Sequence, residues 1–125
     1  MTQTTMSYNE HMQLMEQCIA NCQECLVACE RCIDTCLSMT ERVATLTDCI
    51  RTCRDCADTC AQSVRFMARG SHFHGNICAV CAEVCAACAA ECERARDVAS
   101  CQACAAACRR CEETCRQMGQ MATHA

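Results

Sequence analysis

The spacing of the cysteines constrains this chain more than any other feature. Its twenty cysteines form four groups, and within each group the steps alternate between three and four residues. They are Cys18, Cys22, Cys25, Cys29, Cys32, Cys36, Cys49, Cys53, Cys56, Cys60, Cys78, Cys81, Cys85, Cys88, Cys92, Cys101, Cys104, Cys108, Cys111 and Cys115. Side chains with this spacing share one face of an α-helix. Each group therefore predicts one helix with a stripe of thiols, in the place where a bundle normally carries aliphatic side chains.

Four helices are predicted, at about 7–37, 40–68, 74–94 and 98–118. The chain contains no proline, and good helix formers such as alanine, glutamate and arginine dominate between the cysteines. Ser7 with Glu10, and Ser38 with Glu41, have the spacing of a capping box at two helix starts. Short connections make consecutive helices antiparallel. The prediction is an all-α, antiparallel up-down-up-down four-helix bundle with a cysteine-lined core, forming one domain over residues 1–125.

Aliphatic side chains flank three of the thiol stripes at seven-residue spacing. They are Ile19, Leu26 and Ile33, then Ile50, Ala57 and Val64, and finally Ile77 and Val84. Such flanking stripes either seal the bundle or form a subunit interface, and the sequence leaves both interpretations open.

Composition argues against several classes of partner. The net charge is −4, and no basic stripe accompanies the three aromatic residues Tyr8, Phe66 and Phe73, so nucleic-acid binding is not expected. No apolar stretch appears long enough to span a bilayer, so no membrane partner is expected. Residues 1–10 lack the basic start, apolar run and cleavage site of an export signal. A cytoplasmic location is therefore predicted, where thiols stay reduced.

Thiolates in this number point to a soft metal ion. A site formed by soft thiolate ligands selects Cu(I), zinc or iron–sulfur clusters. A four-thiolate zinc site carries about two negative charges, so five such sites would leave about ten charges in a core without cations. Cu(I) at one ion per thiolate leaves no net charge. An iron–sulfur cluster needs four cysteines at one point and suits continuous stripes poorly.

The two ends of the predicted bundle differ in composition. Extending the stripes outward brings imidazole and thioether groups to one end: His11, Met15, Met67, His74 and Met118. The opposite end carries mostly aliphatic residues: Met39, Val43, Leu46, Ala95 and Val98. Imidazole and thioether bind Cu(I) more weakly than thiolate, which suits an uptake route. Metal is therefore predicted to enter at the His/Met end. Whether His72, Met121 and His124 also contact metal stays open.

An enzymatic function is not predicted, because no nucleophile stands apart from the repeat with a positioned base. A thiol redox buffer is the stronger competitor, since Cys-x-x-Cys recurs throughout the chain. Redox enzymes place such a pair at a helix start, whereas these pairs run through the middle of helices. A disulfide within a regular helix would also strain the backbone.

With these features the whole chain resembles the bacterial copper storage protein family, whose members are cysteine-lined four-helix bundles. The resemblance implies storage of many Cu(I) ions inside the bundle and assembly as a homotetramer. The missing export signal and the high thiol count are similar to the cytosolic branch. The resemblance also implies chelating Cys-x-x-x-Cys pairs: Cys18/Cys22, Cys25/Cys29, Cys32/Cys36, Cys49/Cys53, Cys56/Cys60, Cys81/Cys85, Cys88/Cys92, Cys104/Cys108 and Cys111/Cys115. Cys78 and Cys101 lack a four-residue partner and would bind through three-residue or cross-helix neighbours.

The predicted function is cytosolic storage of many Cu(I) ions on cysteine thiolates, for sequestration, detoxification and later supply. Release would proceed through a copper chaperone, a small thiol or protein turnover. The alternatives are a zinc or general soft-metal buffer and a thiol redox buffer.

Overall fold

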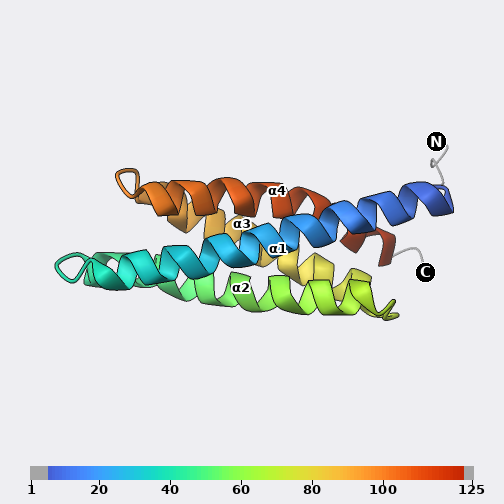
Figure 1. The fold of residues 1–125 in the computed structure, drawn as a ribbon, viewed down its shortest axis with the longest axis horizontal. Helices are drawn as coiled ribbons and strands as arrows, with labels where there is room; N and C mark the ends of the chain where they lie inside the picture. Colours follow the sequence, from blue (N-terminus) through green and yellow to red (C-terminus); the bar gives the residue numbers. More distant parts are fainter. Residues whose placement is uncertain (1–5, 123–125) are drawn as a thin grey trace.

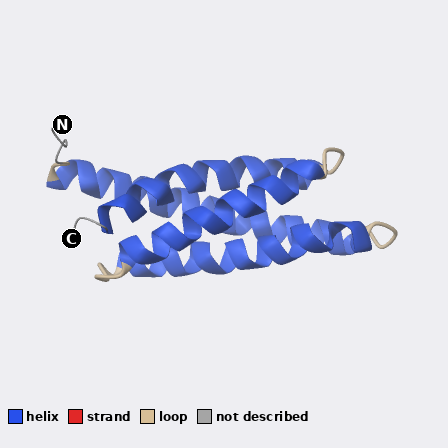
Figure 2. Cartoon of the chain, turned by 180° about the vertical axis from the view of Figure 1, so that it is seen from behind, coloured by secondary structure: helices blue, strands red, loops and turns tan. Residues whose placement is uncertain are grey.

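The structure, a computed structural model, describes residues 6–122 and contains four long helices. They are α1 (Tyr8–Ser38), α2 (Thr47–Ala68), α3 (His74–Arg94) and α4 (Ala99–Ala122), with a short 3₁₀ helix, η1 (Val43–Leu46), before α2. The helices run up and down along one long axis (Figures 1 and 2). The predicted all-α, antiparallel four-helix bundle is confirmed.

The four helices surround a common axis in a closed ring. Both α1 and α3 pack against α2 and α4, while the diagonal pairs make no close backbone contact among the described residues. The α1–α2 and α3–α4 connections lie at one end of the bundle (Figure 1). The start of α1, the α2–α3 turn and the end of α4 lie at the other. Every helix therefore turns one face toward the axis, and that face carries the cysteines.

One of the two predicted helix caps forms and the other does not. The backbone N–H of Glu10 donates to Ser7 Oγ at 3.2 Å, as a capping residue requires. Ser38 instead belongs to the last turn of α1, where its hydroxyl donates to the Asp34 carbonyl at 2.8 Å. The predicted helix start at residue 40 was therefore wrong. The chain first forms η1, and α2 begins at Thr47.

The α2–α3 turn is built on a glycine with a positive φ. Gly70 has φ 63°, a conformation that costs glycine little because it lacks a Cβ. Its N–H donates to the Met67 carbonyl at 3.1 Å, and the Ser71 N–H donates to the Phe66 carbonyl at 2.9 Å. These two bonds form a Schellman motif that ends α2. The turn reverses the chain within five residues and brings the start of α3 beside the end of α2.

Helix α4 is longer than predicted, and a second glycine explains the extension. The prediction ended this helix at 118, but it continues through Gly119 to Ala122. A Cβ at Gly119 would lie 2.9 Å from both the Cα and the Cβ of Ala79 on α3. Glycine here permits close helix packing and does not break the helix.

The flanking aliphatic stripes close the seams between neighbouring helices. Most of their side chains are half-buried and pack against the thiol core: Ile19, Leu26, Ile33, Ile50, Val64 and Val84. Ala57 is buried. The flanking stripes could either seal the bundle or form a subunit interface, and these contacts support a seal around the core. Larger apolar side chains that stay exposed include Val27, Leu37 and Val80.

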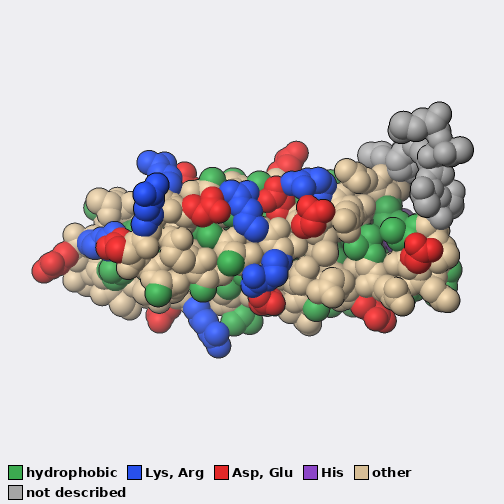
Figure 3. Space-filling view, turned by 90° about the horizontal axis from the view of Figure 1, so that it is seen from above, with side chains coloured by type: hydrophobic (Ala, Val, Ile, Leu, Met, Phe, Trp, Pro, Cys, Tyr) green, Lys and Arg blue, Asp and Glu red, His purple; other side chains and the backbone are tan. Residues whose placement is uncertain are grey.

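The outer surface carries charges of both signs. Figure 3 shows arginine and acidic side chains interspersed along the bundle on the face drawn. Several form ion pairs between helices, as Arg110 of α4 does with Glu24 of α1 and Arg109 with Glu93 of α3. Exposed pairs of this kind contribute about 0–1 kcal/mol each. The surface therefore adds little to stability, which depends on the packing of the interior.

By length and composition alone, α3 is apolar enough to cross a membrane, and it is the one such helix among the residues described. Its most apolar window has a mean hydropathy of 1.4, and 44% of that window is buried in the bundle. The prediction that no apolar stretch is long enough was therefore wrong. The hydropathy arises largely from alanine and cysteine, and the α3 cysteines face the other three helices.

The close approach of α3 and α4 predicts that Gly119→Ala destabilises the protein. Alanine normally stabilises a helix by about 1 kcal/mol relative to glycine. Here the added methyl group meets the Ala79 backbone, so we expect a net loss of about 1–3 kcal/mol. Chemical denaturation of the metal-free, reduced protein, followed by circular dichroism, measures the change. Ala106→Gly, at an exposed position of α4, is the control for helix propensity alone. A more stable Gly119→Ala variant would contradict the packing.

Candidate metal centre

The cysteine side chains form the interior of the bundle. Nineteen of the twenty are completely buried, and Cys49 is 4% exposed. All twenty are free thiols. The predicted cysteine-lined core is therefore present along the length of the bundle. Two methionines, Met67 and Met118, are the largest fully buried side chains and lie beyond the thiols at one end.

The closest sulfur contacts join different helices. Cys32 Sγ lies 3.4 Å from Cys101 Sγ, and Cys49 Sγ lies 3.4 Å from Cys92 Sγ. Contacts within one helix are longer, such as 3.8 Å for Cys81–Cys85 and for Cys111–Cys115, and 4.0 Å for Cys88–Cys92. The pairs expected from the resemblance are thus neighbours, but each thiol has partners at least as near across the bundle. An ion held here would meet sulfur from several helices.

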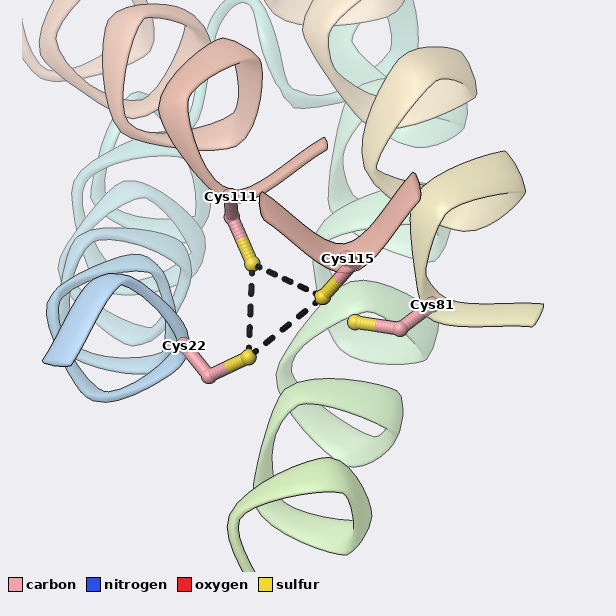
Figure 4. A group of neighbouring side chains, drawn as sticks. All are labelled: Cys22, Cys81, Cys111 and Cys115. Carbon is pink, nitrogen blue, oxygen red and sulfur yellow. Dashed lines mark hydrogen bonds between the residues drawn. The ribbon is translucent and has the colours of Figure 1, made fainter. Parts of the chain in front are cut away.

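Groups of four sulfurs lie close enough together to hold one metal ion. In the group drawn in Figure 4, Cys22 comes from α1, Cys81 from α3, and Cys111 and Cys115 from α4. Their four Sγ atoms all lie within 4.8 Å of one another. Cys22 Sγ is 3.5 Å from Cys111 Sγ and 3.6 Å from Cys115 Sγ. The four side chains point toward a common centre from three helices.

Other four-sulfur groups share cysteines with one another. Four further groups are Cys25/Cys56/Cys60/Cys85, Cys25/Cys29/Cys56/Cys108, Cys29/Cys53/Cys88/Cys104 and Cys32/Cys49/Cys53/Cys92. Cys25 and Cys56 belong to two of these groups, and so do Cys29 and Cys53. A thiolate has several lone pairs and can bridge two ions. The geometry therefore suits a continuous array with bridging sulfur better than isolated four-ligand sites.

The two cysteines without a four-residue partner join this array through other helices. Cys101 Sγ lies 3.4 Å from Cys32 Sγ and 3.7 Å from Cys36 Sγ. Cys78 interacts with Cys115 and Cys18 at the other end. Cross-helix neighbours were the expected alternative for both residues, and the structure provides them.

Hydrogen bonds among the thiols separate their pKa values. Donation from Cys115 and Cys22 lowers the pKa of Cys18. The pKa of Cys115 is raised, first by Cys111 and then by Cys18, because the donor of such a bond holds its proton. Burial raises the pKa of Cys36 to about 12. An ion that binds a thiol with a raised pKa, such as Cys36 or Cys115, must displace its proton.

The core offers no positive charge to balance thiolates. Among residues 6–122 the buried polar side chains are Ser63 and Thr114, and all eleven basic residues are arginines, none of them buried. A buried anion without a partner is costly. A monovalent ion that replaces one proton leaves the charge of the core unchanged. A zinc ion bound by four thiolates adds about two negative charges to the core. The electrostatics of the observed core therefore favour Cu(I).

One end of the bundle carries the five residues predicted to admit metal. They are His11, Met15, Met67, His74 and Met118. The three methionines are buried, and the two histidines are half-buried with ring centroids 6.0 Å apart. The antiparallel arrangement brings these residues together as expected, and their contact with metal stays a prediction. His72 is exposed and Met121 half-buried. His124 lies outside the described residues.

A hydrogen bond prepares His74 to act as a ligand. Its Nδ1 lies 2.7 Å from the Ser71 carbonyl oxygen. Because a carbonyl only accepts, Nδ1 is the donor in this contact, so the Nδ1–H tautomer is the one that offers a lone pair on Nε2. The same kind of bond orients metal-binding histidines in many proteins. His74 can therefore offer Nε2 to a soft ion at the mouth of the core.

Two further features of the core concern a buried hydroxyl and a partly exposed thiol. Ser63 is fully buried in the stripe of α2, three residues after Cys60, and its hydroxyl has no hydrogen-bond partner. Its spacing from Cys60 places it on the outward extension of the α2 stripe, together with Met67, and the structure buries both side chains. At the opposite end Leu46, Ala95 and Val98 are buried as predicted, yet Cys49 beside them keeps a small exposed area. The sequence carries no signal for this exposure.

A family model described as copper storage protein matches residues 11–120. None of the proteins with curated descriptions matches the chain. Among solved structures, the metal-free copper storage protein 3 of Bacillus subtilis is 45% identical, with a TM-score of 0.76. The match covers 83% of this chain and 97% of that one. Its Cu(I)-bound form is similar at 44% identity and a TM-score of 0.78, over 85% and 98% of the two chains.

A cytosolic copper storage protein of Streptomyces lividans, solved with five coppers, is also similar. It is 41% identical over 86% of this chain and 93% of that chain, with a TM-score of 0.82. The family match extends over most of the sequence and includes all twenty cysteines. The chain therefore belongs to the copper storage protein family.

Proposed function

We propose that this protein stores Cu(I) in the cytoplasm, bound by its twenty cysteine thiolates at up to about one ion per thiol. The observation that carries the proposal is the array of four-sulfur groups that share cysteines along the axis. Structures of relatives with bound Cu(I), and with five coppers, support it. Storage keeps a redox-active ion out of free solution and available for later supply, and no catalytic step is part of the proposal.

Zinc or general soft-metal buffering is the second candidate, since thiolates also bind zinc. The absence of a buried cation among the described residues argues against filling the core with zinc. A redox buffer is disfavoured because the cysteines are distributed over a continuous buried array, and the Cys-x-x-Cys pair at the start of α4, Cys101 and Cys104, is completely buried.

Assembly and release are further parts of the proposal. Resemblance to the family supports a homotetramer, and the exposed Val27, Leu37 and Val80 give apolar area for contact between subunits. Copper would leave to a copper chaperone or to a small thiol. Neither nucleic acid nor a membrane is a proposed partner.

The proposal predicts a large difference in capacity between the two metals. In an anaerobic titration of the reduced protein against calibrated competing chelators, we expect uptake of on the order of one Cu(I) per thiol. Zinc uptake should be limited to a few weakly held ions, because the core cannot balance the charge. Tight zinc at about one ion per four thiols, with no larger Cu(I) capacity, would instead establish a metal buffer.

Replacing sulfurs in the middle of the array should lower capacity without unfolding the bundle. Cys56 Sγ lies 3.6 Å from Cys85 Sγ and 3.9 Å from Cys108 Sγ. In Cys85→Ala/Cys108→Ala we expect a loss of roughly two Cu(I), measured by metal analysis after desalting, with an unchanged helical circular dichroism spectrum. Ala87→Ser/Ala106→Ser, on the exposed faces of the same helices, is the matched control. Undiminished copper binding by the cysteine variant would place the ions elsewhere.

The His/Met end predicts an effect on rate and not on capacity. His11→Ala/His74→Ala removes both imidazoles from the mouth, so initial Cu(I) uptake, followed by stopped-flow ultraviolet absorbance, should slow by about two- to tenfold. The final number of bound ions should stay the same because the thiols are intact. His72→Ala, at an exposed position of the α2–α3 turn, is the control. Uptake at the normal rate in the double variant would exclude these histidines from the route.

A further inference from the structure

A polar crevice lies at the end of the bundle opposite the histidines. It has a volume of about 250 Å³ and is lined by Arg42, Thr45, Leu46, Asp48, Cys49, Glu91, Arg94 and Ala95. It opens between η1, the first turn of α2 and the last turn of α3. The aliphatic residues that seal this end form only part of its wall. The crevice is large enough for a small molecule and too small for a protein segment of any length.

Cys49 connects this crevice to the array of thiols. Among the twenty cysteines it alone retains exposed area. Its Sγ lies 3.4 Å from Cys92 Sγ on α3, and 3.9 Å from both Cys32 Sγ on α1 and Cys101 Sγ on α4. An ion on Cys49 therefore has sulfur neighbours on the three other helices, and it can pass into the shared groups by exchanging one sulfur at a time.

Charges of both signs surround the opening. Arg42 and Arg94 supply guanidinium groups, and Asp48 and Glu91 supply carboxylates. Such a lining suits a molecule that carries an ammonium and a carboxylate together, and it does not favour a simple anion. A small zwitterionic aminothiol has these groups and adds a sulfur that can reach Cu(I).

An ion pair holds the wall of the crevice in place. Arg42 Nη1 donates to Asp97 Oδ2 at 2.7 Å, and Nη2 donates to Oδ1 at 3.2 Å. This two-point contact joins the α1–α2 connection to the α3–α4 connection, across the end of the bundle. Arg42 and Cys49 both line the crevice, so movement of Arg42 would enlarge the opening to Cys49, and the ion pair is placed to control access.

We propose that this crevice is a second port of the bundle, where a small zwitterionic thiol exchanges Cu(I) with Cys49 under the control of the Arg42–Asp97 pair. The inference rests on the proposed storage of Cu(I). In the exchange, a bond forms between copper and the incoming sulfur, and the bond between copper and Cys49 Sγ breaks. The proton of the incoming thiol passes to Cys49 Sγ, and copper stays Cu(I) throughout.

The first test uses the metal-free, reduced protein under native conditions. Iodoacetamide should modify Cys49 at least about tenfold faster than any fully buried cysteine. Trypsin cleaves after Arg42 and Arg51, and the peptide 43–51 contains Cys49 as its one cysteine, so mass spectrometry reports it separately. Equal modification of all cysteines, or faster modification of one at the His/Met end, would overturn the port.

The second test measures release from the copper-loaded protein to a Cu(I) chelator, with L-cysteine as the carrier thiol. Asp97→Asn removes the ion pair and should speed both release and Cys49 modification by about two- to fivefold. Glu24→Gln breaks the Arg110–Glu24 pair at mid-bundle with the same change in charge, and it should change neither. Neutral 2-mercaptoethanol at equal concentration should carry copper more slowly than L-cysteine.

The outcomes separate this inference from the storage function. Suppose that Cu(I) capacity is normal but Asp97→Asn and Glu24→Gln show the same rates of copper release and of Cys49 modification. That result would overturn the port and leave storage standing. Failure to bind copper would overturn storage, while the modification of Cys49 in the metal-free protein would still test whether the crevice gives access to the core.

Discussion

The need to keep a sulfur-filled core electrically neutral governs this structure. Twenty thiols lie in the interior of the bundle, and the part of the chain described here buries no cation beside them. Protons can balance the charge in the metal-free state, and a monovalent ion can replace them one for one. A divalent ion in four-thiolate sites would leave buried negative charge. The same constraint therefore allows the empty bundle to fold and favours Cu(I) as its cargo.

Close packing of the helices follows from the small size of the cysteine side chain. Sulfur contacts of 3.4 Å across the bundle require helices that approach closely. Alanine on α3 and α4, and Gly119 against Ala79, make this approach sterically acceptable. The half-buried Ile19, Leu26 and Ile33 then cover one seam from outside. The ends remain the places where an ion can pass: one carries imidazole and thioether groups, and the other places Cys49 beneath a polar crevice.

Helix bounds follow from the sequence where one periodic signal dominates, and they do not where contacts between particular side chains determine the end of a helix. The α3 bounds, 74–94, were predicted to the residue because Gly70 and the following turn separate it sharply from α2. Ser38 was misread as a cap because spacing alone does not show that its hydroxyl already bonds to the Asp34 carbonyl. The end of α4 was misplaced because the role of Gly119 depends on Ala79, forty residues earlier in the chain. The apolar character of α3 was underestimated because its hydropathy comes largely from alanine and cysteine and not from a run of long aliphatic side chains.

The sequence by itself determined that four helices form and that the thiols share one face of each, because a step of three or four residues sets the angle around a helix axis. It also determined which groups lie at each end, since antiparallel order follows from short connections. Only the tertiary structure decided which sulfurs meet, as in the sharing of Cys25 and Cys56 by two groups. It alone decided that Cys49 keeps an exposed area beneath the crevice. The physical reason is that periodicity fixes direction around each helix, whereas the offset between helices along the bundle depends on turns and side-chain packing.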